Sequence, residues 1–155
     1  MEITTKDKKQ LVKEFNEVFN EFGYEKSFDD ESHCYTRIKH PKTKYFVHCS
    51  DFWDMAHFIR CIKNAKEQGL NMDLANPDFV MNLGFLFSML TSIRVYDGIN
   101  LDTILTNRYI QNYEISNEIK LFFAEYVRDM VENIRYAFTD SEGVEYNTHD
   151  YKKIY

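Results

Sequence analysis

The fold depends on one stretch, Asn76 to Tyr96, which reads NPDFVMNLGFLFSMLTSIRVY. From Phe79 to Ile93 it contains no charged residue, and its apolar residues run round the whole helical projection instead of forming one stripe. This pattern predicts a helix that is buried on most sides. The residues Asn76, Pro77 and Asp78 suit the N-cap and the first turn of such a helix.

A membrane span is the competing interpretation of this stretch. Spanning a bilayer needs about 20 apolar residues. This run is shorter, is interrupted by Asn82, Gly84 and Ser88, and is closed by Arg94. We therefore expect a buried core helix and no membrane association, and we expect Gly84 to permit a close helix contact.

The composition bounds the class of protein. The 155 residues are 44% hydrophobic and 16% aromatic, which fits one globular domain with a single core. A formal net charge of −6 argues against nucleic-acid binding through a basic face and leaves a basic protein partner open. The segment Met1–Lys9 is polar, so no signal peptide is expected, and three cysteines without framework spacing indicate the cytoplasm.

Helical periodicity predicts further helices on both sides of the central one. The first begins at Thr4 or Thr5 and ends at Gly23, and the second runs from Ser50 or Asp51 to about Gln68. A short helix is expected between Leu101 and Ile110, and a long amphipathic helix begins near Ser116. The polar segment from Tyr24 to Ser32 is predicted as a loop, and residues 139–155 as a mobile tail or a short strand.

The period changes to two between Cys34 and Cys49, which predicts a β-hairpin with a turn at His40-Pro41-Lys42-Thr43. A type I turn with Pro41 at its first central position places Ile38 opposite Tyr45 and Cys34 opposite Cys49. Together these elements predict an α+β class, with a mostly helical single domain comprising an N-terminal helix, a β-hairpin and then three or four helices around a buried central helix.

A zinc site is one chemical hypothesis for the segment from His33 to Cys61, which contains every cysteine and four of the five histidines. Cys34 and Cys49 would face each other on the hairpin, and His57 and Cys61 are four residues apart on a helix, so Cys34, Cys49, His57 and Cys61 could supply four ligands. No Cys-x-x-Cys pair accompanies them, and buried cysteines are common without any metal. We therefore expect no cofactor, with zinc as the alternative.

A thiol nucleophile is a second chemical hypothesis. The candidate pairs are Cys49 with His48, and Cys61 with His57, with Asp54 as the only carboxylate on the same flank. Neighbouring residues on a strand point to opposite faces, which weakens the first pair. A zinc-binding or thiol-dependent enzyme is accordingly the alternative function.

The favoured function is a non-catalytic protein-binding module that inhibits or neutralises a specific partner, such as an immunity protein or a phage anti-defence protein. Small size, acidic helices and no recognisable catalytic motif support this hypothesis. The acidic surface of the last helix would comprise Glu118, Glu125, Asp129 and Glu132, and the tip of the hairpin offers Arg37, Lys39, Lys42 and Lys44. Self-association through exposed aromatic residues is the alternative to a different protein partner.

Overall fold

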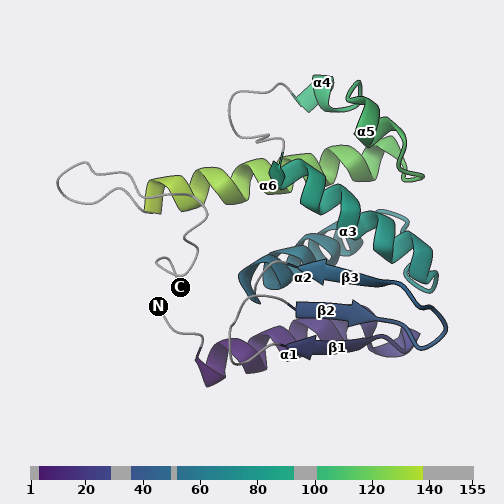
Figure 1. Cartoon of the computed structure of the whole chain (residues 1–155). Helices are drawn as coiled ribbons and strands as arrows, with labels where there is room; N and C mark the ends of the chain where they lie inside the picture. Colours follow the sequence, from purple (N-terminus) through teal and green to yellow (C-terminus); the bar gives the residue numbers. More distant parts are fainter. Residues whose placement is uncertain (1–3, 29–35, 50–51, 93–100, 138–155) are drawn as a thin grey trace.

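The computed structural model describes residues 4–28, 36–49, 52–92 and 101–137 (Figure 1). The N-terminal helix α1 (Thr5–Phe19) continues into a short 3-10 helix, η1 (Asn20–Phe22), and three strands follow: β1 (Glu25–Phe28), β2 (Thr36–Lys39) and β3 (Phe46–Cys49). After the strands come α2 (Phe52–Glu67), α3 (Pro77–Ser92), the short helices α4 (Leu101–Ile104) and α5 (Arg108–Gln111), and α6 (Asn117–Ala137). The predicted α+β class is confirmed, and the molecule is mostly helical with one small antiparallel sheet.

The predicted helix ends are largely confirmed. The Thr4 hydroxyl accepts a hydrogen bond from the backbone N–H of Asp7, and the Asp7 carboxylate accepts one from the backbone N–H of Thr4, which is a capping box. Gly23 and Gly69 close η1 and α2 with φ angles of 81° and 82°. The Ser116 hydroxyl accepts from the N–H of Ile119 at the start of α6. Two short helices, α4 and α5, replace the one predicted after residue 100.

The sheet has the order β1-β2-β3, and its first strand was not predicted. The expected loop after Tyr24 instead forms β1, which pairs with β2 so that Lys26 lies opposite Ile38. The sequence did not reveal this strand because three of its four residues are polar, and its pairing depends on β2, which lies beyond it in the chain. The capping residues of α2, Cys34 and the predicted tail of residues 139–155 lie outside the described residues.

The predicted register of the hairpin is wrong by two residues. Ile38 lies opposite Val47, and Cys49 lies opposite Thr36 instead of Cys34. The expected turn does form, since the N–H of Thr43 bonds the carbonyl of His40. The Thr43 hydroxyl then accepts from the N–H of Tyr45, so the loop spans residues 40–45 and pairing resumes only at Lys39 and Phe46. A shift of two residues keeps each side chain on its predicted face.

The core lies between the sheet, α1, α2, α3 and α6. In Figure 1, α1 and α2 lie behind the sheet, α3 passes beside β3, and α6 lies on the far side of α3 from the sheet. α2 and α3 meet through Phe58 and Phe87, whose ring centroids are 5.6 Å apart. Among the described helices, none combines the length and the apolar character needed to cross a bilayer.

The central helix is less buried than its sequence predicts. One side is fully packed, with Leu83, Leu86 and Leu90 completely inaccessible to solvent. On the other side Phe85 is 49% exposed. α3 contacts β3 and α6, and these contacts cover only part of its circumference. The apolar residues of α3 therefore lie partly in the core and partly on the surface that faces solvent.

Candidate functional site

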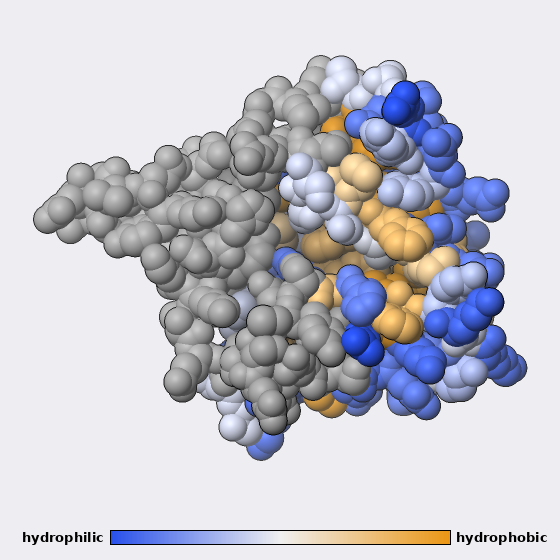
Figure 2. All heavy atoms as spheres, viewed as in Figure 1, coloured by the Kyte–Doolittle hydropathy of each residue, from blue (hydrophilic) through white to orange (hydrophobic). Residues whose placement is uncertain are grey.

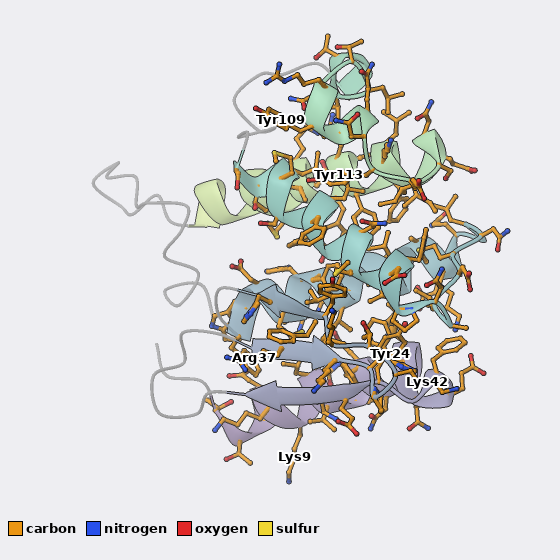
Figure 3. The ribbon with its side chains drawn as sticks, turned by 45° about the vertical axis from the view of Figure 1, so that its right-hand side comes forward. Lys9, Tyr24, Arg37, Lys42, Tyr109 and Tyr113 are labelled. Atoms are coloured by element: carbon orange, nitrogen blue, oxygen red, sulfur yellow. The ribbon has the colours of Figure 1, made fainter. Side chains whose placement is uncertain are left out.

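Two of the predicted partner-binding residues lie on the hairpin. Arg37 belongs to β2 and Lys42 to the β2–β3 loop, and Figure 3 shows them at opposite ends of the sheet, with Lys42 close to Tyr24. The Arg37 guanidinium lies 5.1 Å from the centroid of the Phe46 ring, and the Phe46 and His48 rings are 4.6 Å apart. Because Ile38, Val47 and Cys49 point into the core, the residues that alternate with them form the outer face of the sheet.

We call the outer face of β2 and β3, together with their loop, the hairpin surface. It consists of Arg37, Lys39, Lys42, Lys44, Tyr45, Phe46 and His48. Tyr45 is 54% exposed, and the Lys44 ammonium lies 5.6 Å from the centroid of its ring. Cationic and aromatic side chains are therefore in contact on this surface.

The other predicted binding residues lie on α6. Glu118, Glu125 and Asp129 are exposed, as the periodicity of the helix predicts, whereas the side chain of Glu132 lies outside the described part. Arg128 Nη2 is 3.9 Å from Glu125 Oε1 and 3.3 Å from Asp129 Oδ1. One guanidinium is thus shared by two of the carboxylates, which lowers the net negative charge that this helix presents to a partner.

A groove of about 640 Å³ opens at the loop end of the hairpin surface. Its walls come from three segments that are far apart in the sequence: the end of η1, the β2–β3 loop, and the segment that leads into α3. The lining residues are Glu21, Phe22, His40, Lys42, Thr43, Lys44, Tyr45, Ala75, Pro77 and Asp78. The sequence offered no signal for this groove beyond the lysines of the hairpin.

Two packed rings, the buried Tyr24 and the half-buried His40, join the walls of this groove. His40 Nε2 lies 3.0 Å from the carbonyl oxygen of Phe22, and His40 Nδ1 accepts a hydrogen bond from the N–H of Lys42. The His40 ring packs edge-on against Tyr24 at 5.0 Å, and the Tyr24 hydroxyl donates to the carbonyl of Leu74. Burial, with a smaller contribution from the Asp73 carboxylate, raises the pKa of Tyr24 to about 12, so the phenol keeps its donor proton.

The three described residues of the predicted zinc site do not form a metal-binding group. Cys49 lies on β3 with Thr36 opposite, and Cys34 lies outside the described residues. In the part of the chain that the structure describes, no three His, Cys, Asp or Glu side chains are placed to hold a metal ion, so Cys49, His57 and Cys61 do not form such a group. The zinc site stays a prediction, without geometric support from its three described members.

The surroundings of the candidate cysteines do not favour a thiol nucleophile. Cys61 is completely buried, and burial raises the pKa of its thiol well above the usual range, which disfavours the thiolate that a nucleophile requires. Burial and the charge of Arg60 lower the pKa of His57 to about 4, and its Nδ1 lies 3.3 Å from the Tyr126 hydroxyl. His48 is exposed on the outer face of the sheet and Cys49 is buried on the inner face, as the alternation of a strand requires.

Comparison with known proteins identifies no relative of this chain. No protein-family model matches the chain, and the searches of curated proteins and of solved structures found no match either. The fold and the site together define a small α+β domain with an aromatic and cationic hairpin surface beside a groove.

Proposed function

We propose that this protein is a non-catalytic protein-binding module that neutralises a specific partner and contacts it through the hairpin surface. The observation that carries this proposal is an exposed apolar area bordered by cationic side chains. Figure 2 shows apolar residues gathered at the centre of the face that carries the sheet and α3, with hydrophilic residues beside them. An apolar centre with a polar rim is the usual anatomy of a protein–protein interface.

Phe85 supports this proposal from α3. Its neighbour Gly84 packs against Val47 of β3, so Phe85 lies near the hairpin, and about half of its side chain is exposed. Tyr45 is exposed to a similar degree on the loop, and the next residue, Phe46 of β3, is half-buried. Aromatic side chains, phenylalanine included, are enriched at interfaces, and tyrosine is among the residues that contribute most to binding energy.

The lysines of the hairpin surface are available to a partner. None of Lys39, Lys42 and Lys44 forms an ion pair with another residue in the described part of the chain. On α2, by contrast, Arg60, Lys63 and Lys66 are each paired with a glutamate. We therefore propose an acidic partner surface, in place of the basic partner that the acidic helix suggested.

As a location we propose the cytoplasm, because cysteines without framework spacing are typical of a reducing compartment.

The test is quantitative affinity capture from the organism that encodes the protein, with three charge-reversed variants beside the wild type. Lys42→Glu/Lys44→Glu alters the hairpin surface, Glu125→Lys/Asp129→Lys alters α6, and Lys6→Glu/Lys9→Glu makes the same charge change as the first variant on the exposed part of α1. We expect a partner whose recovery falls by roughly tenfold with the hairpin variant alone.

Two results would contradict the proposal. Equal recovery by the wild type and the hairpin variant would exclude the hairpin surface, and loss restricted to the α6 variant would move the interface to the acidic helix. Thermal unfolding of all the variants is the folding control. Surface substitutions of this kind are expected to change the free energy of unfolding by about 0.5 kcal/mol or less.

A further inference from the structure

We propose that the groove between η1, the β2–β3 loop and the start of α3 is the anchor subsite of this interface, and that it accepts an apolar side chain flanked by carboxylates on the partner. This inference rests on the proposed function and names the chemistry of the segment that the partner must supply. It depends on three observations: the fixed shape of the groove, its apolar walls and its uncompensated positive charge.

The shape of the groove is fixed by contacts that do not involve a ligand. The His40 ring connects the β2–β3 loop with the carbonyl of Phe22. Tyr24 connects the same region with the carbonyl of Leu74, which directly precedes the lining residue Ala75. These hydrogen bonds hold walls from residues 21–22, 40–45 and 75–78 together. A groove that is already formed requires little ordering when a ligand binds, which favours its use as an anchor site.

The walls of the groove are apolar in the part formed by Phe22, Tyr45 and Pro77. The Phe22 ring has the Lys66 ammonium 5.9 Å from its centroid, and the Tyr45 ring has the Lys44 ammonium at 5.6 Å. A volume of about 640 Å³ lies within the range of sites that hold small ligands, so a large aromatic side chain and its neighbours can enter.

The charges of the groove favour an anion. Two carboxylates, Glu21 and Asp78, lie in its lining beside Lys42 and Lys44. Lys66 pairs with Glu21 at 3.8 Å, so together with Lys66 three ammonium groups lie beside these two carboxylates, an excess of one positive charge. The groove is therefore locally positive on a chain whose formal net charge is −6.

Three tryptophan derivatives test this inference because they share one indole side chain and carry a negative, a zero and a positive charge, each changed through one end group. N-acetyltryptophan carries a carboxylate, N-acetyltryptophanamide is neutral, and tryptophanamide carries an ammonium group. Each is titrated into the full-length, ¹⁵N-labelled protein at concentrations up to the order of 10 mM, where weak fragment binding is measurable by NMR. We expect shifts at residues 21–23, 40–45 and 75–78, with the anion binding about threefold tighter than the neutral amide and the cation weakest.

Two variants and a matched control assign the effect to the groove. Lys42→Gln/Lys44→Gln is expected to bring the affinity for the anion to that for the neutral amide, whereas Tyr45→Ala weakens the binding of all three derivatives. Lys6→Gln/Lys9→Gln removes the same number of charges from α1, away from the groove, and is expected to leave the order of affinities unchanged. Amide shifts that spread over the whole spectrum would identify a variant that fails to fold.

Several results would overturn the inference. Absence of shifts at the groove, shifts confined to another surface, or preference for the cation would each do so. If no derivative enters the groove while partner capture still requires Lys42 and Lys44, the anchor subsite is wrong and the protein-binding function stands. If N-acetyltryptophan binds as expected and no partner depends on the hairpin, the groove is a site for a free aromatic carboxylate, and its assignment to a protein segment is wrong.

Discussion

Gly84 is the residue at which the packing of α3 is closest. A Cβ atom built at this position would lie 2.7 Å from Val47 Cγ1 and 3.2 Å from Val47 Cγ2. The sequence predicts that Gly84 permits a close contact between helices, and the structure shows that the neighbour is strand β3 instead. The missing side chain thus allows the central helix to approach the edge of the sheet.

The substitution Gly84→Ala tests this contact. Overpacking is expected to cost about 2 kcal/mol, and the better helix propensity of alanine returns about 1 kcal/mol, so the free energy of unfolding falls by about 1 kcal/mol. Val47→Ala removes the two methyl groups that the new Cβ would meet. In the Gly84→Ala/Val47→Ala variant we expect a smaller loss than the sum of the single variants, as measured by urea unfolding.

Gly69→Ala is the matched control for this cycle. Its φ of +82° makes alanine unfavourable, but a Cβ atom there would meet nothing within 4 Å. Its effect should therefore add to that of Val47→Ala. If Gly84→Ala and Val47→Ala are also additive, the close approach of α3 and β3 does not limit the packing.

At the scale of elements, α1 and α2 are joined by a series of ion pairs. Glu14 pairs with Arg60 at 2.9 Å, Glu17 with Lys63 at 2.8 Å, and Glu21 of η1 with Lys66 at 3.8 Å. Because the partner numbers rise together on both helices, α1 and α2 run parallel. Three strands between them return the chain to the same starting end (Figure 1).

The first two of these pairs differ in burial, and this difference predicts their strength. Glu14 is almost completely buried and also accepts a hydrogen bond from Gln10, whereas Glu17 and Lys63 are more than a third and about a third exposed. In double-mutant cycles with glutamine, we expect a coupling energy of about 1.5 kcal/mol for Glu14 with Arg60 and a clearly weaker coupling for the exposed pair of Glu17 with Lys63.

Salt distinguishes the two pairs further. Raising the ionic strength should weaken the exposed Glu17–Lys63 coupling and leave most of the Glu14–Arg60 coupling, because a buried pair is screened less. Equal coupling energies for both pairs, or equal sensitivity to salt, would mean that burial does not determine the contribution of these pairs. Both cycles are measured by urea unfolding at the same pH.

The elements that the sequence predicted well are those with strong local signals. The capping box at Thr4 and Asp7 fixes the start of α1, and the regular apolar spacing from Ile119 to Met130 fixes the buried side of α6. β1 lacks such a signal because three of its four residues are polar, and it pairs with residues of β2 that lie 8 to 14 positions further along the chain. In the hairpin loop the N–H of Tyr45 donates a hydrogen bond to the Thr43 hydroxyl, which lengthens the loop and shifts the register. The period-two alternation of the sequence gives no sign of such a side-chain bond.

At the scale of the whole molecule, the candidate site too could be predicted only where its residues lie within one element. The lysines of the hairpin and the carboxylates of α6 could be named from the sequence because each set lies within one element. The groove could not, since its walls come from residues 21–22, 40–45 and 75–78. Tertiary contacts such as those of Tyr24 and His40 bring these segments together, and pairs of this kind leave no periodic pattern.

His57 connects pH with the stability of the whole molecule. It lies on α2, is almost completely buried, and contacts Tyr126 of α6, so its environment exists only when the two helices are docked. Burial is the larger cause of its low pKa, and the charge of Arg60 adds to it, which keeps the imidazole neutral in the folded protein until the pH approaches about 4.

The direction of the pH dependence follows from this low pKa. In the unfolded chain a histidine has a pKa of about 6.5, so between pH 6.5 and pH 4 the unfolded state binds a proton that the folded state does not. The free energy of unfolding therefore falls as the pH falls through this window, by about 2 kcal/mol between pH 7 and pH 5. Urea unfolding at pH 7, 6 and 5 measures this change.

The His57→Gln variant should lack this component while it keeps the contributions of the other titratable groups, so the wild type and the variant are expected to diverge as the pH is lowered. Parallel pH profiles would show that His57 is protonated without cost in the folded protein, and that its burial between α2 and α6 does not control the acid stability of the molecule.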